Sequence, residues 1–171
     1  DQIWRENELE YAFLQAKTKD KKEFTNLLLE GIPTNYRWSC WKAMTEITSE
    51  KDPQLYSRLR KSEATEYVVN CIDKDVNRTF PDHEFFENEA GGQNHLRRLL
   101  TAYAIRDARV GYCQGMNFIG GFLIQVSGAE EEDCFWILQK LFAFYGLRGF
   151  YENNFPVLQL YAYIFNQLFK E

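Results

Sequence analysis

The sequence predicts an all-α fold, built as one multi-helix unit. Apolar residues recur at spacings of three and four through almost every segment, which is the pattern of a helix with one buried face. Sustained alternation of apolar and polar residues between hairpin turns, the pattern of a strand, is not found. With 171 residues, of which 45% are hydrophobic and 16% aromatic, the chain can bury one sizeable core.

Four helices are expected before residue 62, each marked by apolar residues at helical spacing. Their faces are Leu9, Phe13 and Ala16; Phe24, Leu27 and Leu28; Tyr36, Cys40 and Met44; and Leu55 with Leu59. Gly31 suits the residue that follows the second helix, because glycine readily adopts positive φ. Pro33 and Pro53 suit the first turns of the third and fourth helices.

Five further helices are expected after residue 62. Their apolar faces are Tyr67, Val68, Cys71 and Ile72; Leu96, Leu99, Leu100, Tyr103 and Ala104; Ile119, Phe122, Leu123 and Val126; Phe135, Trp136, Leu138, Leu141 and Phe142; and Leu160, Tyr161, Ile164, Phe165 and Leu168. Residues 82–94 are polar and contain glycine, so we expect a loop there, and Gly111 is expected to end the helix that follows it. Acidic residues 130–133 suit a helix N-terminus. The aromatic last helix, which Pro156 opens, is expected to pack against more protein.

The composition argues against several classes of protein. A net charge of −5 without a long basic run does not suit a protein that binds the nucleic-acid backbone. The longest nearly apolar stretch, residues 118–126, is too short to span a bilayer, and no secretory signal is visible. Four cysteines without C-x-x-C spacing and two isolated histidines predict reduced thiols and no metal site. We therefore expect a cytoplasmic protein.

The first candidate functional residue is Arg78, which lies where a helix ends before Pro81. A guanidinium stabilises negative charge on phosphate oxygens by its own charge and by bidentate hydrogen bonds. Asp75 lies three residues earlier, so the two side chains share a helix face and the carboxylate could orient the guanidinium. An ordinary surface ion pair is the alternative interpretation of the same spacing.

The second candidate is Gln114, which Gly111 and Gly115 flank at the start of a helix. Its amide can donate and accept hydrogen bonds at once, which suits it to holding an attacking water. Asn117 could cap the helix that follows. A simple turn remains the alternative for Gln114 itself.

Residues near the two candidates allow two other interpretations. Cys113 could act as a nucleophile with His95 as its base, although nothing in the spacing brings the two together. The cations Arg97, Arg98, Arg106 and Arg109 are expected to form a solvated helix face rather than a binding patch.

Three sequence blocks occur in an order that resembles the TBC domain family of Rab GTPase-activating proteins. The first is Gly31-Ile32-Pro33 followed by Arg37 and Trp41. The second runs from Ile72 through Asp75 and Arg78 to Thr79-Phe80-Pro81, and the third is Tyr112-Cys113-Gln114-Gly115-Met116-Asn117. Each block alone is moderately specific, and the three in order are highly specific. The stretches at residues 131–136 and 145–151 are also similar to the family.

The resemblance implies roles for these residues. Arg78 would be an arginine finger and Gln114 a glutamine finger, both offered in trans to a GTP-bound Rab. Asp75 would support Arg78, with Thr79, Tyr112, Gly115 and Asn117 as further supporting residues of the two motifs. Arg37 and Trp41 would be structural or site-supporting. A non-catalytic module that binds a Rab or scaffolds a complex is the alternative function.

The resemblance also bounds the domain and its partners. Residues 1–30 would form a helical extension, and residues 31–171 the N-terminal part of the domain, with its C-terminal subdomain absent. GTP and Mg²⁺ would be carried by the GTPase, since the sequence lacks a G-x-x-x-x-G-K-[ST] loop and needs no cofactor of its own. The family implies a role in vesicle trafficking, with peripheral association to endomembranes through other regions or partners.

Overall fold

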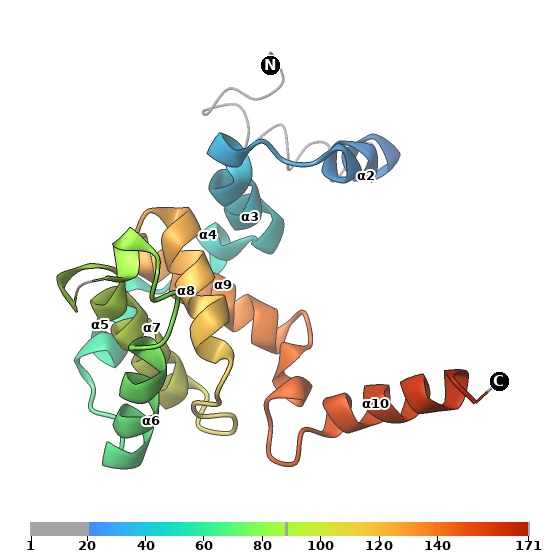
Figure 1. The fold of residues 1–171 in the computed structure, drawn as a ribbon. Coiled ribbons are helices and arrows are strands. Elements are labelled where there is room, and N and C mark those ends of the chain that lie inside the picture. The colour runs from blue at the N-terminus through green and yellow to red at the C-terminus, as the bar shows by residue number, and fades with distance from the viewer. Residues whose placement is uncertain (1–20, 88, 171) are drawn as a thin grey trace.

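The computed structural model describes residues 21–87 and 89–170, and within them the chain is helical without strands, as the sequence predicts (Figure 1). The α-helices are α2 Lys21–Glu30, α3 Arg37–Thr45, α4 Ile47–Glu50, α5 Pro53–Lys61, α6 Glu66–Val76, α7 Asn94–Arg106, α8 Met116–Ser127, α9 Glu131–Ala143 and α10 Pro156–Leu168. Short 3-10 turns are η1 Thr34–Tyr36, η2 Glu84–Phe86 and η4 Leu147–Phe150, and η3 Glu89–Gln93 is a π turn. The helix expected around Leu9 and Phe13 lies outside the described residues.

Local signals in the sequence set several helix ends. Gly31 follows α2 with a φ of 92°, a conformation that suits glycine. Asp52 caps α5, because its carboxylate accepts hydrogen bonds from the backbone N–H of Gln54 and Leu55 at 3.0 and 3.1 Å. Pro53 occupies the first turn of α5, as expected.

The centre of the molecule is α7, which packs against α5, α6, α8 and α9. Its predicted face is buried, and Leu96, Leu99, Leu100 and Tyr103 are fully enclosed. Gly120 lets α8 pack closely against α7, since a Cβ there would lie only 2.9 Å from a Leu96 methyl carbon. This contact brings α8, and the loop before it, against the core.

The N-terminal helices join this core through α3. Trp38 is buried in the main core, while Cys40 and Ala43 form a second small cluster. Tyr36 and Met44 pack against Cys40 in that cluster, so the predicted α3 face is confirmed.

The structure corrects some of the expected elements. Tyr67 is 78% exposed instead of lying on the buried face of α6, because that face runs through Val68, Ile72 and Val76, and Tyr67 lies about 100° to its side. Residues 82–94 are not a plain loop: they contain η2 and η3, and Phe86 of η2 is buried. The helix α7 ends at Arg106 rather than Gly111, since the Asp107 backbone carbonyl accepts hydrogen bonds from Val110 and Gly111.

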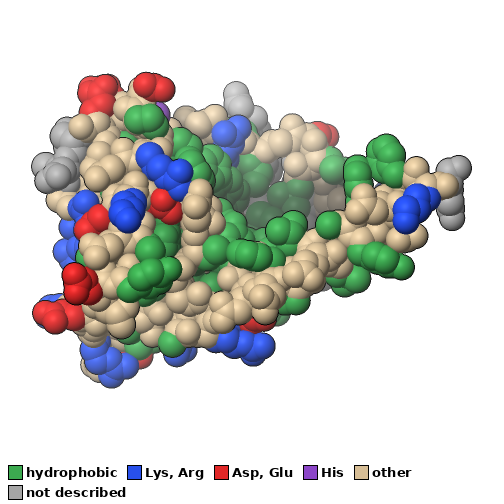
Figure 2. All heavy atoms as spheres, turned by 60° about the horizontal axis from the view of Figure 1, so that its bottom comes forward, with side chains coloured by type: hydrophobic (Ala, Val, Ile, Leu, Met, Phe, Trp, Pro, Cys, Tyr) green, Lys and Arg blue, Asp and Glu red, His purple; other side chains and the backbone are tan. Residues whose placement is uncertain are grey.

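At the other end of the chain, α10 extends away from the body of the molecule (Figures 1 and 2). Its large apolar side chains are 44–67% exposed, so the described residues do not cover it. Figure 2 shows hydrophobic side chains along this helix and around the hollow beside it. The expectation that this helix packs against more protein stays a prediction.

The helices of residues 21–87 and 89–170 are too short or too polar to cross a membrane.

Candidate functional site

Arg78 lies in the turn that follows α6, where its backbone N–H donates to the carbonyl of Asp75 at 3.2 Å. Its side chain is 52% exposed. The guanidinium Nε and Nη2 both contact Oδ1 of Asp75 at 2.8 Å, which confirms the contact expected from their spacing. A guanidinium has five N–H donors, so one edge is held while others stay available to a partner.

Asp75 also contacts the second motif. Its carboxyl Oδ2 accepts a hydrogen bond from the Tyr112 hydroxyl at 2.6 Å, while Oδ1 faces Arg78. Burial, and then the hydrogen bond to Asp75, raise the pKa of Tyr112 well above its ordinary value, so the phenol stays a donor at physiological pH. One buried carboxylate therefore connects the arginine turn to the loop that carries Gln114.

A second bridge joins the same two segments. The Thr79 hydroxyl donates to the backbone carbonyl of Asp75 at 2.6 Å and accepts from the Asn117 amide at 2.8 Å. The Asn117 carbonyl oxygen in turn accepts from the backbone N–H of Gly115 at 3.0 Å. Thr79 and Asn117 are almost fully buried, so this chain of hydrogen bonds is shielded from water.

The predicted capping role of Asn117 is wrong. The residue before α8 is Gly115, and Asn117 lies inside the first turn, where its side chain turns back between the two loops. Gly115 adopts a φ of 99°, a conformation that L side chains rarely reach, so glycine is required for this turn.

Gln114 is exposed at the apex of this turn. Among the described residues, none forms a hydrogen bond with its side-chain amide. The ring of Tyr151 packs 3.7 Å from the position of a Cβ on Gly115, so it borders the Gln114 loop. The amide is thus presented to solvent by a loop whose backbone is fixed on both sides.

Arg78 and Gln114 line two different depressions in the surface. The Arg78 depression, of about 380 Å³, is also lined by Phe80, Pro81, Asp82, His83, Phe118 and Gln125. The Gln114 depression, of about 410 Å³, is also lined by Cys113, Leu147, Phe150, Tyr151, Phe155 and Leu158. The structure therefore links the two loops through buried side chains but gives each exposed side chain its own depression.

Arg37 and Trp41 do not belong to this group of contacts. Both lie on α3, where the Arg37 Nε donates to the backbone carbonyl of Ile32 at 3.2 Å. The Trp41 ring lies 5.7 Å from the ring of Phe122 on α8. These contacts hold α3 to the segment before it and to α8, and neither involves Asp75.

The cysteine alternative finds no geometric support. Burial, and then the Asp75 carboxylate, raise the pKa of the Cys113 thiol, whereas an activated nucleophile needs a lowered pKa. The proposed base, His95, contacts Glu131 at 2.7 Å and Arg98 at 3.0 Å instead. Within residues 21–87 and 89–170, no group of histidines, cysteines and carboxylates is arranged to hold a metal ion.

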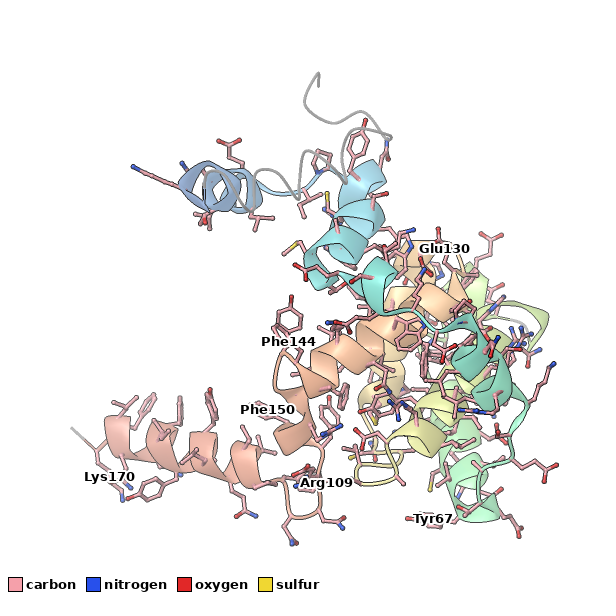
Figure 3. The ribbon with its side chains drawn as sticks, turned by 180° about the vertical axis from the view of Figure 1, so that it is seen from behind. Tyr67, Arg109, Glu130, Phe144, Phe150 and Lys170 are labelled. Atoms are coloured by element: carbon pink, nitrogen blue, oxygen red, sulfur yellow. The ribbon has the colours of Figure 1, made fainter. Side chains whose placement is uncertain are left out.

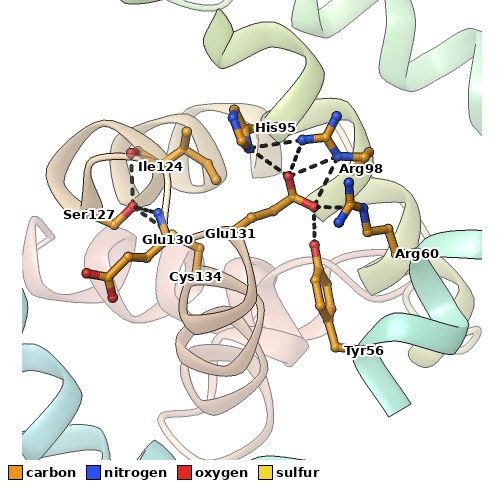
Figure 4. A network of polar contacts seen from close by, with 9 residues as sticks. All are labelled: Tyr56, Arg60, His95, Arg98, Ile124, Ser127, Glu130, Glu131 and Cys134. Carbon is orange, nitrogen blue, oxygen red and sulfur yellow. Dashed lines mark hydrogen bonds and ion pairs between the residues drawn. The ribbon is translucent and has the colours of Figure 1, made fainter. Parts of the chain in front are cut away.

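A second polar cluster was missed by sequence reasoning (Figure 4). Glu131, at the start of α9, is 8% exposed and accepts hydrogen bonds from Tyr56 and from Arg98, with the Arg98 Nη2 at 2.5 Å. Arg60 approaches the same carboxylate at 3.6 Å. Arg98 is thus paired rather than part of a solvated face, and no local spacing signals a contact between residues 33 positions apart.

The Glu131 carboxylate is held ionised by its partners. Burial by itself would raise its pKa, but hydrogen bonds from Arg98, Tyr56 and His95 outweigh burial and lower the pKa below its ordinary value. This carboxylate fastens α5, α7 and α9 together.

The fold and the site define an all-helical domain in which two linked loops expose Arg78 and Gln114. Residues 34–171 match the family model for the Rab-GTPase-TBC domain. This protein belongs to the Rab-GTPase-TBC domain family.

Individual relatives agree with this assignment. The chain is 33% identical over 157 residues to the human "Ecotropic viral integration site 5 protein homolog", which covers 91% of this chain and 19% of the relative. It is 35% identical over 136 residues to the Caenorhabditis elegans "Rab GTPase-activating protein eat-17", covering 79% and 15%. The human "Growth hormone-regulated TBC protein 1" is 37% identical over 116 residues, covering 66% and 34%. The matched parts of the chain thus span 15–34% of the length of these relatives.

Solved structures show the same fold at lower identity. The Chlamydomonas flagellar RabGAP TBC domain superposes with a TM-score of 0.68 at 24% identity, covering 81% of this chain and 50% of that one. The Ypt/Rab-GAP domain of Gyp1p superposes with a TM-score of 0.64 at 21% identity, covering 97% and 66%.

Proposed function

We propose that the protein stimulates GTP hydrolysis on a Rab-type small GTPase in its GTP-bound state, with Arg78 and Gln114 as two fingers offered in trans. The observation that carries this proposal is the Asp75 carboxylate, which holds one edge of the Arg78 guanidinium and is tied to the Gln114 loop by Tyr112. GTP and Mg²⁺ arrive with the GTPase. A relative of this chain is named as a Rab GTPase-activating protein, which supports the same class of partner.

In this proposal Arg78 stabilises charge that develops on the phosphate oxygens during transfer to water. Its Nε and Nη2 rest against Asp75 while half of the side chain is exposed, so a phosphate can approach the remaining donors. An arginine supplied by an activating protein is worth about 10³ to 10⁵ in rate. That factor corresponds to roughly 4 to 7 kcal/mol of barrier.

Gln114 would orient the attacking water. Its amide carries both a donor and an acceptor, and it is exposed on a turn that needs no rearrangement to present it. By the resemblance, it takes the place of the GTPase's own switch glutamine. Neither finger needs a shifted pKa to act, since neither transfers a proton.

The buried residues would act by positioning. Asp75 limits the directions that the guanidinium can take, and the bridge through Thr79 and Asn117 keeps the Gln114 turn fixed relative to α6. Positioning of this kind lowers the entropy lost when the partner docks.

The decisive experiment is a single-turnover hydrolysis assay on a panel of GTP-loaded Rab GTPases, with Gln114→Ala as a companion variant. We expect the protein to accelerate hydrolysis on at least one member, and Gln114→Ala to lose most of that acceleration while keeping its thermal unfolding midpoint. Tight binding to a GTP-loaded Rab without any acceleration would instead support the non-catalytic scaffolding function.

We also propose that the protein is cytoplasmic and associates peripherally with endomembranes. A role in vesicle trafficking would require its activity there. Imaging of the tagged protein tests this placement. Accumulation inside a membrane-bounded lumen would contradict it.

A further inference from the structure

Two phenylalanines on α8 are exposed although most of the helix packs into the core. Phe118 is 45% exposed and Phe122 is 49% exposed. Being four residues apart, they lie on the same side of the helix, one turn from each other. Singly exposed apolar residues are common on protein surfaces, whereas neighbouring ones that form a patch often mark an interaction surface.

This surface begins inside the candidate functional site. Phe118 lines the same depression as Arg78, and its ring lies 5.7 Å from the ring of Phe80, two residues after Arg78. Gln114 lies four residues before Phe118. A partner that fills the Arg78 depression therefore contacts Phe118 as well.

Phe122 continues the surface away from the site. It borders an apolar groove of about 350 Å³ formed where α3, α8 and α9 meet. The groove is also lined by Trp41, Met44, Thr45, Ile119, Leu123, Ile137, Leu141 and Tyr145. Exposed phenylalanines on one side of α8 thus line both the Arg78 depression and this groove.

The chemistry of the surface specifies what it takes. The helix α8 contains no charged residue, and the groove lining contains none either, so the charges near Phe118 are those of Arg78 and Asp82. An ionic partner segment would lose its hydration here without gaining an opposite charge. The matching surface of a partner is therefore apolar.

We propose that Phe118 and Phe122 dock an apolar side chain that the GTPase presents beside its bound GTP. This inference rests on the proposed function, because it takes the occupant to be the partner that Arg78 and Gln114 serve. Aromatic residues at the centre of an interface commonly dominate its binding energy. In this arrangement the fingers supply the chemistry, and the two phenylalanines supply much of the affinity.

The test separates docking from chemistry by comparing Phe118→Ala with a matched control. Tyr67→Ala is that control, since Tyr67 is 78% exposed at the outer end of α6 (Figure 3). For Phe118→Ala we expect KM for the GTP-loaded GTPase to rise about tenfold or more, with kcat within twofold of wild type. Phe118→Leu should recover part of the loss, and Tyr67→Ala should change neither constant.

Direct binding to the GTPase loaded with a non-hydrolysable GTP analogue distinguishes this inference from the proposed function. Binding that Phe118→Ala weakens, in a protein that never accelerates hydrolysis, sustains the docking surface and overturns the fingers. If Phe118→Ala leaves KM and affinity unchanged, the docking surface is overturned. A fall in kcat alone also overturns it, because Phe118 then acts only through Phe80. Self-association that Phe122→Ala abolishes without changing GTPase binding also overturns it, since a second copy is then the occupant. A wild-type protein that binds no member of the panel overturns both proposals.

Discussion

Two buried carboxylates in this molecule hold the same kinds of partner and leave them in different states. Asp75 contacts an arginine and a tyrosine hydroxyl, and so does Glu131. The arginine beside Asp75 is 52% exposed, whereas Arg98 beside Glu131 is 32% exposed and shares its carboxylate with further donors. The first arrangement leaves a guanidinium able to act on a partner, and the second satisfies it within the fold.

The difference follows from how many donors surround each carboxylate. The Glu131 cluster (Tyr56, Arg60, His95, Arg98 and Glu131) gathers its donors from α5 and α7 around one acid on α9. The Asp75 cluster (Asp75, Arg78, Thr79, Tyr112, Gly115 and Asn117) has a single arginine, which sits in a turn at the surface. The carboxylate of Glu131, surrounded by several donors, stabilises the fold. The carboxylate of Asp75, which holds a single arginine, can present that arginine to a partner.

The largest expected effect separates the two arginine environments through activity. Arg78→Ala is expected to lower stimulated GTP hydrolysis by about 10³ to 10⁵, because the charge stabilisation by the guanidinium is lost. The thermal unfolding midpoint should stay close to that of wild type, since the side chain is half exposed. Single-turnover assays on a GTP-loaded Rab, together with thermal melts, measure both quantities.

Arg97→Ala is the matched control for that variant. Arg97 pairs with Asp73 at 2.5 Å on the neighbouring helix and lines neither finger depression, so its loss should leave hydrolysis unchanged. Arg78→Lys keeps the charge but not the planar fork of donors. Wild-type stimulation by Arg78→Lys would sink the finger role.

The next effect falls on stability and comes from the other cluster. Glu131→Ala leaves Arg98 and Tyr56 without their shared acceptor, and we expect a loss of about 3–5 kcal/mol in the free energy of unfolding. Denaturant titration measures this loss. Asp73→Ala, which breaks the more exposed pair with Arg97, should cost about 1 kcal/mol or less. Equal losses in the free energy of unfolding for the two variants would show that the Glu131 cluster does not stabilise the fold more than a surface ion pair does.

A smaller effect comes from removing one hydroxyl from each cluster. Tyr112→Phe and Tyr56→Phe each leave a buried carboxylate oxygen short of a donor, at a cost of about 1–3 kcal/mol in the free energy of unfolding. We expect only Tyr112→Phe to lower kcat for stimulated hydrolysis, because it loosens the acid that holds Arg78. Assays at a temperature where both variants are folded make the comparison, and equal losses of kcat would contradict it.

The sequence could predict the parts of this picture that depend on local spacing. Helical periodicity predicts the enclosed face of α7. The contact between Asp75 and Arg78 follows from their three-residue separation. These features are readable because the chain geometry that produces them lies within one or two helical turns.

Contacts between distant segments could not be predicted. Tyr112 meets Asp75 across 37 residues, and Asn117 meets Thr79 across 38, so the two bridges exist only once α7 folds between them. The partners of Glu131 also come from distant segments. In the sequence, an acidic residue at a helix start is explained by the helix dipole alone, so nothing indicated these partners. The roles of Arg78 and Gln114 stay predictions for the assays above.

The smallest effect concerns pH and again separates the two clusters. Hydrogen bonds from Arg98, Tyr56 and His95 lower the pKa of Glu131 in the folded protein in spite of burial. The unfolded chain therefore binds more protons in acid, and stability must rise with pH there. The contribution of Glu131 is fully present above its unfolded pKa, near 4.5, and is lost as pH falls through the lower folded value.

Denaturant titrations of wild type and Glu131→Gln between about pH 6 and pH 3 test this expectation, because only the carboxylate titrates. The wild type should lose stability more steeply in acid than Glu131→Gln does. Asp133, whose pKa Lys51 also lowers against the effect of burial, adds to the acid loss, so Asp133→Asn must be compared in parallel. Asp133→Asn should keep the part of the slope that Glu131 causes. If Glu131→Gln and wild type instead have the same slope, Glu131 is not held ionised by its donors, and the contrast with the Asp75 cluster loses its electrostatic basis.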